Sequence, residues 1–219
     1  MAGTYRDGAS SRRELPVLPF PPSDSLRPLT YTTLLGLLAA TGLRPGEALA
    51  LDTADVDLDA GLLMIRQSKF GKSRVVPVDD STREALRQYL AQRTALCPQP
   101  SSPAFLLSEH GRRLRGNATR RMFAVVSCAS GLRPPLHGRR WGRGPRLQDL
   151  RHTFATHRLV EWYRAGVDVA RVLPTLATYL GHVSIGLTYW YIEAVAELLA
   201  HATTRLGSPW AFSLAADST

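Results

Sequence analysis

Cysteine, lysine and long apolar runs are all scarce in this chain of 219 residues. Its two cysteines, Cys97 and Cys128, are too few to cross-link a secreted scaffold, and they form no Cys-x-x-Cys pair that would indicate a zinc site. No stretch approaches about 18 consecutive apolar residues, and no apolar run follows a basic start at the N-terminus. We therefore expect a cytoplasmic protein with reduced thiols, no membrane partner and no metal site.

Arginine carries almost all of the basic charge. Lys69 and Lys72 are the two lysines among 27 basic residues, and the formal net charge is +9. Residues 110–158 hold twelve arginines and a single acidic residue, Asp149. A guanidinium group can bind two oxygens of one phosphate at the same time, so a clustered arginine surface indicates a nucleic-acid partner. A compositional preference for arginine over lysine does not explain the clustering.

Proline content and apolar patterning divide the chain into three parts. Residues 1–28 contain five prolines and predict a flexible lead-in. Residues 29–206 carry helical and β-prone patterns throughout and predict one domain, and residues 207–219 form a weakly patterned tail. The expected fold class is mainly α with a small antiparallel β-sheet (α+β).

Helices are predicted from apolar periodicity, capping residues and proline breaks. A hairpin is predicted at residues 62–66 and 74–78, with both lysines in its turn, and residues 104–107 are a candidate third strand. Residues 131–145 are rich in Gly, Pro and Arg and predict a loop. The expected helices span residues 29–42, 45–51, 81–97, 117–129, 147–164, 169–180, 184–191 and 194–206.

Four separated segments carry groups suited to attack on a phosphodiester. The first, TGLRPGE, places Arg44 at a helix start, and the second is Lys69 in the hairpin turn. The third, DLRHTFAT, contains Arg151, and the fourth, LGH, ends at His182 with Tyr191 nine residues later. The first two segments are weak signals singly. The order, spacing and residue types of the last two are specific.

This set of residues resembles the catalytic domain of the tyrosine recombinases, also called phage integrases, over roughly residues 29–206. The resemblance implies the tyrosine recombinase catalytic-domain fold. It also implies a site-specific recombinase that integrates or transposes DNA, cleaving and rejoining strands through a 3′-phosphotyrosyl intermediate. No cofactor, metal or ATP is expected to take part. The implied partners are double-stranded DNA and further recombinase protomers, identical or different, on the same DNA. The DNA-bound protein would be associated with the nucleoid.

The residue types suit the steps of such a cleavage. Tyr191 is the expected nucleophile, and Lys69 is expected to protonate the leaving 5′ oxygen. Arg44 and Arg151 are expected to bind the two non-bridging phosphate oxygens, where charge accumulates in the transition state. His182 is expected to hydrogen-bond the phosphate or to orient Tyr191.

Two neighbouring residues compete for these roles. Tyr189 lies two residues from Tyr191 and so on another face of a helix, and the nine-residue offset from His182 selects Tyr191. Lys72 competes with Lys69. By the family pattern the first lysine is catalytic, and Lys72 is expected to meet DNA phosphate.

Supporting residues and DNA contacts complete the expected site. By the resemblance, Glu47 supports Arg44 and the helix joint rather than touching DNA. The further DNA contacts are expected from the arginines of the Gly- and Pro-rich loop and the residue just after it, namely Arg139, Arg140, Arg143 and Arg146.

Two features depart from the family. Gln148 stands three residues before Arg151, where the family usually has histidine, and glutamine donates a hydrogen bond but transfers no proton at neutral pH. Only 28 residues precede the first expected helix, in place of the usual helical domain that closes around DNA. The alternative interpretation is a weak or inactive truncated recombinase acting as a DNA-binding accessory protein. A second alternative is RNA binding by the arginine-rich loop alone.

Overall fold

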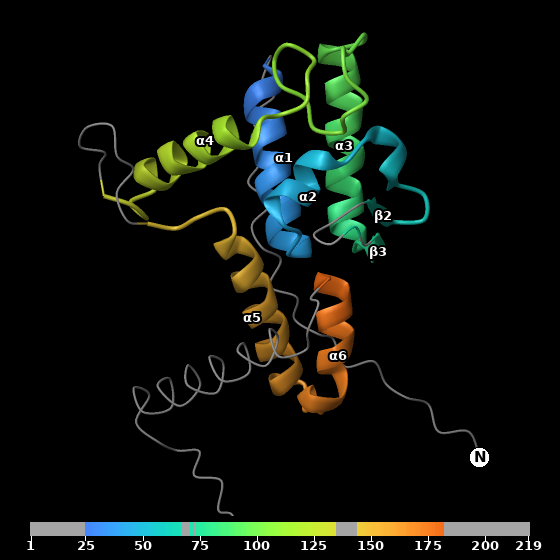
Figure 1. Cartoon of the computed structure of the whole chain (residues 1–219), viewed down its shortest axis with the longest axis vertical. Coiled ribbons are helices and arrows are strands. Elements are labelled where there is room, and N and C mark those ends of the chain that lie inside the picture. Colours follow the sequence, from blue (N-terminus) through green and yellow to red (C-terminus); the bar gives the residue numbers. More distant parts are fainter. Residues whose placement is uncertain (1–24, 67–70, 72, 135–143, 182–219) are drawn as a thin grey trace, which may run out of the picture.

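A computed structural model describes residues 25–66, 71, 73–134 and 144–181, and every structural statement below concerns these residues. The described part of the chain forms six α-helices and a small sheet, whose strands β2 and β3 lie beside α3 (Figure 1). In chain order the elements are α1 (Leu26–Thr41), α2 (Pro45–Ala50), a 3₁₀ turn η1 (Thr53–Asp55), β1 (Val56–Asp57), β2 (Leu62–Ile65), β3 (Arg74–Pro77), α3 (Asp80–Leu96), α4 (Gly116–Ala129), α5 (Asp149–Arg164) and α6 (Val169–Leu180).

Helix α1 ends where helix α5 packs against it. Gly42 follows the helix with a φ of 61°, a left-handed conformation that glycine adopts at little cost, and its N–H donates to the carbonyl of Leu38. A Cβ at this position would lie 2.5 Å from Cδ1 of Phe154 on α5. The glycine therefore both ends α1 and admits the α5 side chain.

The sheet is antiparallel, with strand order β1-β2-β3. Strands β2 and β3 form the predicted hairpin, with Leu63 opposite Val76. The candidate third strand at residues 104–107 is wrong, because only single bridges join Ala104 to Asp52 and Leu107 to Arg113. The third strand is instead β1, which is two residues long and too short to leave a periodic pattern in the sequence.

Two hydrophobic clusters meet at a polar seam. The larger cluster joins α1, the sheet, α3 and the buried segment 104–107, and the smaller one joins α5 to α6 through residues such as Leu159 and Leu173. Figure 1 shows α5 and α6 extending together from the rest of the described fold. Contacts of α1 with α5 and of β3 with α6 connect the two parts. The candidate site lies at this seam.

Several helix boundaries differ from the prediction. Helix α1 begins at Leu26 and α5 begins at Asp149, and Asp79 rather than Ser81 caps α3 by accepting a hydrogen bond of 2.7 Å from the N–H of Thr82. The expected lead-in, residues 1–28, ends too late, because residues 26–28 form the start of α1. Residues 1–24, the tail and the helices expected at 184–191 and 194–206 lie outside the described residues. Within the described ranges, no helix is long and apolar enough to cross a membrane.

Candidate active site and nucleic-acid interface

Arg44 stands in the joint between α1 and α2, where Pro45 opens the second helix. Its backbone N–H and its guanidinium Nη1 donate to the two carboxylate oxygens of Glu47, at 3.0 and 2.9 Å. The expected contact between Glu47 and Arg44 is therefore present. The Arg44 side chain is 23% exposed and lines a pocket.

Three arginines converge on the C-terminal end of α6, at residues 179–181, which we call the α6 terminus. The last carbonyls of a helix have no partner within it and carry partial negative charge, which favours cationic donors. Each arginine donates to a different carbonyl of the α6 terminus: Arg74 Nε to Tyr179 at 2.9 Å, Arg151 Nη2 to Leu180 at 2.6 Å and Arg44 Nη2 to Gly181 at 3.2 Å.

Arg151 also joins α6 to α1. It is only 2% exposed, and its Nη1 donates to the carbonyl of Gly42 at 3.0 Å. One guanidinium thus satisfies carbonyls at the ends of two helices from different hydrophobic clusters. Arg151 does not line the pocket that Arg44 reaches, and the binding of a phosphate by this pair stays a prediction.

Glu47 is the buried counter-charge of this arginine cluster. Arg74 binds it through both Nη atoms, at 2.9 and 2.8 Å, and the Glu47 side chain is only 6% exposed. Burial alone would raise the pKa of Glu47. The hydrogen bonds from Arg74 and from the backbone of Arg44, with the charge of Arg74, instead hold that pKa below its ordinary value, so the carboxylate stays ionised.

Replacing Glu47 by glutamine should lower the free energy of unfolding by about 2 kcal/mol at neutral pH, because both arginines lose their charged acceptor. Since the folded pKa is depressed, the wild-type advantage is complete above the ordinary glutamate pKa of about 4.3 and is lost as the pH falls through the lower folded value. Urea unfolding of both proteins at neutral and acid pH measures this difference. Glu84→Gln, an exposed change on α3, serves as the control, and an equal loss in both variants at neutral pH would contradict the role of Glu47.

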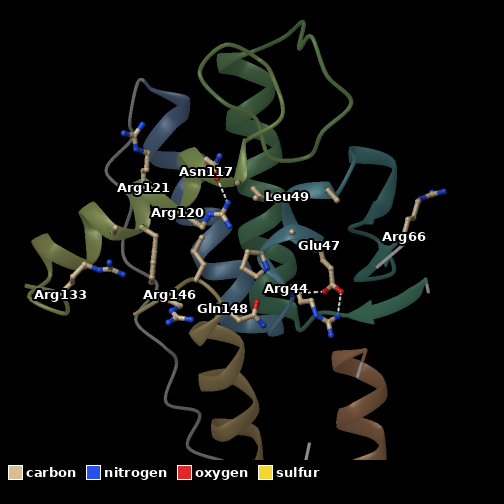
Figure 2. A pocket seen from close by; sticks show the side chains of 17 residues that line it. Arg44, Glu47, Leu49, Arg66, Asn117, Arg120, Arg121, Arg133, Arg146 and Gln148 are labelled. Carbon is tan, nitrogen blue, oxygen red and sulfur yellow. Dashed lines mark hydrogen bonds and ion pairs between the residues drawn. The ribbon is translucent and has the colours of Figure 1, made fainter. Parts of the chain in front are cut away.

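The pocket beside Arg44 has a volume of about 1070 Å³ and lies between α2, α4 and the start of α5 (Figure 2). Glu47 is the one acidic residue among those lining it. Four of the arginines have protein acceptors: Arg44 donates to Glu47, Arg66 pairs with Asp55, Arg120 donates to Oδ1 of Asn117, and Arg133 donates to the carbonyl of Pro145. The excess of positive charge suits a polyanion. The lining arginines are Arg44, Arg66, Arg120, Arg121, Arg133 and Arg146.

The described residues bring several predicted positions together. Gln148 and Arg146, which lie just before α5, line the same pocket as Arg44. The remaining predicted site residues lie outside the described ranges, and their roles stay predictions: Lys69, Lys72, Arg139, Arg140, Arg143, His182 and Tyr191. His182 directly follows Gly181 in the sequence, so the α6 terminus leads into the LGH motif.

Tyr179 also lies at this site, but its ring and its hydroxyl group are both engaged in contacts within the protein. Its ring stacks on Phe154 with centroids 5.7 Å apart, and its hydroxyl donates to the carbonyl of Pro77 at 3.4 Å. Burial raises the pKa of Tyr179 to about 12, so its phenol stays protonated at neutral pH. In the described ranges, no three His, Cys, Asp or Glu side chains gather to hold a metal ion.

Sequence reasoning treated Arg74 only as a strand residue. Alternation in a strand places it on the same face as Val76, which is fully buried, so a charged residue on an inward face was the available signal. The predicted site likewise did not include Arg120, Arg121 and Arg133, although the basic cluster of residues 110–158 contains all three. Their meeting with Arg44 depends on how α4 packs against α2.

Comparison with known proteins gives the family. The model of the phage integrase family matches residues 21–197, most of the chain. The chain belongs to the phage integrase family. The resemblance to tyrosine recombinases is thereby confirmed, and the described fold is that of their catalytic domain, mainly helical with a small antiparallel sheet.

Individual relatives of this tyrosine recombinase domain agree. A protein of Sinorhizobium fredii, provisionally named integrase/recombinase y4rB, is 48% identical over 186 residues, covering 84% of this chain and 58% of its own. Tyrosine recombinase XerD of Caulobacter vibrioides is 34% identical over 182 residues, covering 81% and 54%. The tyrosine recombinase domain therefore spans little more than half the length of these relatives.

Solved structures show the same fold. The crystal structure of XerA recombinase superposes with a TM-score of 0.62 and 25% identity, covering 83% of this chain and 58% of that one. XerH site-specific recombinase bound to its palindromic difH substrate gives a TM-score of 0.58 at 24% identity, covering 80% and 45%. The latter likeness concerns the fold alone.

Proposed function

We propose that this chain is the catalytic part of a site-specific DNA recombinase, acting in integration or transposition, that cleaves and rejoins strands through a 3′-phosphotyrosyl bond to Tyr191. One observation carries the proposal. Arg151 and Arg44, from motifs far apart in sequence, donate to the adjacent carbonyls of Leu180 and Gly181 respectively, directly before His182. This convergence is what a site assembled around one phosphate requires.

The proposed cleavage is an exchange of phosphodiester bonds. The phenolic oxygen of Tyr191 releases its proton to solvent, attacks the scissile phosphorus and forms a new phosphorus–oxygen bond. The bond to the 5′ oxygen breaks, and Lys69 supplies a proton to that oxygen and is reprotonated from solvent. Arg44 balances the additional negative charge of the transition state, a contribution of about 3 kcal/mol for one such donor in a water-poor site. Rejoining is the reverse exchange, so neither ATP nor a metal is required.

The arginine-lined pocket is proposed to hold the DNA backbone next to the reacting phosphate. Arg120 and Arg121 on α4 both face solvent and both line this pocket. Replacing both by glutamine should weaken binding to duplex DNA of any sequence and lower the slope of log affinity against log salt by about 2, because roughly one counterion is released per phosphate contact. Fluorescence anisotropy titrations at several salt concentrations give this slope.

The double variant Arg83→Gln/Arg87→Gln is the matched control. These residues lie on α3, away from the pocket, where each pairs with an aspartate. The same loss of net charge there should leave the salt slope unchanged. Equal slopes for the two double variants would mean that overall charge, and not this pocket, binds the DNA.

We further propose that several recombinase protomers, identical or different, assemble on the DNA. A lambda integrase dimer bound to a core site and a transposon integrase bound to transposon-end DNA share this fold, with TM-scores of 0.52 and 0.56. The bound protein would then be associated with the nucleoid. Its binding curve would be cooperative in protein concentration.

Covalent capture tests the proposed function without knowledge of the target site. The full chain is mixed with a library of short duplexes of randomised sequence, each nicked just 3′ of the candidate cleavage position. The small 5′-hydroxyl fragment then diffuses away after cleavage and prevents rejoining. A protein–DNA adduct that survives denaturing electrophoresis supports the recombinase.

A second candidate function, a DNA-binding accessory protein without cleavage, is favoured by Gln148, which stands at the pocket where the family usually has histidine. Binding to the library without any adduct would overturn the catalytic proposal and support this accessory role.

A further inference from the structure

We propose that Arg74 is a positioning residue for strand cleavage, which holds the α6 terminus, and so the start of the His182 segment, in register with Arg44. The inference rests on the proposed function for its link to cleavage. Arg74 itself does not line the pocket.

Both ends of the Arg74 guanidinium have protein acceptors. Its Nη1 and Nη2 bind the two carboxylate oxygens of Glu47 as a planar fork, while its Nε binds the carbonyl of Tyr179. The side chain is 13% exposed. An arginine with three directed hydrogen bonds and this little exposure is fixed in orientation, so it can fix the groups that it binds.

Gly181 lies directly against this guanidinium. Its φ is 66°, and a Cβ at this position would stand 2.8 Å from Nη1 and 3.0 Å from Cζ of Arg74. The left-handed turn that ends α6 therefore closes onto the arginine, and only glycine leaves room for both. The backbone conformation of Gly181, where the described part of the chain ends, is therefore matched to this contact.

Arg74 also orients Arg44. The Nη1 atoms of both arginines donate to the same oxygen of Glu47, Oε1, at 2.9 Å each. Two arginines share one carboxylate, so the triad keeps one net positive charge for a phosphate. A lysine at position 74 would keep this charge but could not bind both oxygens of Glu47 and the carbonyl of Tyr179 together.

The discriminating variant is therefore Arg74→Lys in the full chain. At saturating concentrations of the nicked duplex library, we expect its rate of adduct formation to fall roughly tenfold to a hundredfold, because small misplacements of reacting groups have effects of this size. Its affinity for duplex DNA should stay within about twofold of wild type, since the charge is kept. Arg87→Lys, the same substitution at a remote surface position, should change neither quantity.

Hydrogen exchange gives a readout independent of cleavage. The N–H of Gly181 donates to the carbonyls of Ala177 and Thr178, and its exchange should be faster in Arg74→Lys and unchanged in Arg87→Lys. Unchanged exchange in Arg74→Lys, a wild-type cleavage rate, or a loss of affinity that matches the loss of rate would each overturn the inference. The last result would make Arg74 a direct DNA contact.

The experiments distinguish failure of the proposed function from failure of the inference about Arg74. If the wild-type chain forms no adduct, the catalytic proposal fails. Faster exchange at Gly181 in Arg74→Lys would then support the holding of the α6 terminus by Arg74, and unchanged exchange would overturn it.

Discussion

Replacing Tyr191 by phenylalanine should abolish covalent capture of nicked DNA, a loss of more than about a thousandfold in the rate of adduct formation. The change removes the single oxygen that forms the bond to phosphorus and keeps the aromatic ring. Affinity for duplex DNA should stay within about twofold, because the proposed DNA contacts are the arginines of the pocket, which the change leaves in place. Adduct yield on denaturing gels and anisotropy titrations measure the two effects.

Tyr189→Phe provides the matched control for this experiment. It removes the same hydroxyl group two positions away in the sequence, where the nine-residue spacing from His182 is broken. Its adduct yield should equal that of wild type. If Tyr189→Phe loses the adduct and Tyr191→Phe keeps it, the assignment of the nucleophile from spacing is wrong.

Replacing Arg151 by alanine should lower the free energy of unfolding by about 3 to 4 kcal/mol. The buried guanidinium is a donor to the carbonyls of Gly42 and Leu180, and each buried carbonyl left without a partner costs about 1 to 3 kcal/mol. The loss would be a large fraction of the 5 to 15 kcal/mol that is typical of a folded domain. Urea unfolding followed by circular dichroism measures it.

Arg158→Ala on the same helix is the control for Arg151→Ala. Arg158 is exposed, pairs with Glu161 and lies 5.6 Å from the centroid of the Phe154 ring. Its removal should cost less than about 1 kcal/mol, since exposed ion pairs and cation–π contacts are weak. Similar losses from both variants would show that Arg151 does not hold α1 and α6 together.

Local features of the fold were predictable because their causes are local. The bounds of α6, residues 169–180, follow from an apolar pattern between Asp168, which caps the helix, and Gly181, which ends it. The hairpin of β2 and β3 follows from two β-prone runs around a turn. The two-residue strand β1 and the isolated bridges at residues 104–107 were not predictable, because they depend on partners distant in the sequence.

The candidate site also has some features that the sequence predicted and others that it did not. The spacing of its motifs predicted the family, which is confirmed, and placed Arg44 and Glu47 at one helix joint, where they bind each other. It did not reveal that Arg151 is buried between the ends of two helices, nor that Arg74 binds Glu47. The acceptor that a guanidinium finds is set by which helix ends arrive beside it.

The order and spacing of the chemical groups, the helices that carry them and the strong basic charge were thus determined by the sequence itself. They rest on residue type and on backbone preferences over a few positions. Only the tertiary structure decided that three arginines share the α6 terminus and that one pocket gathers arginines from α4 and from the segments next to α2, β2 and α5. Such convergence depends on how two hydrophobic clusters pack at their seam, and the packing of whole elements has no local signature in the chain.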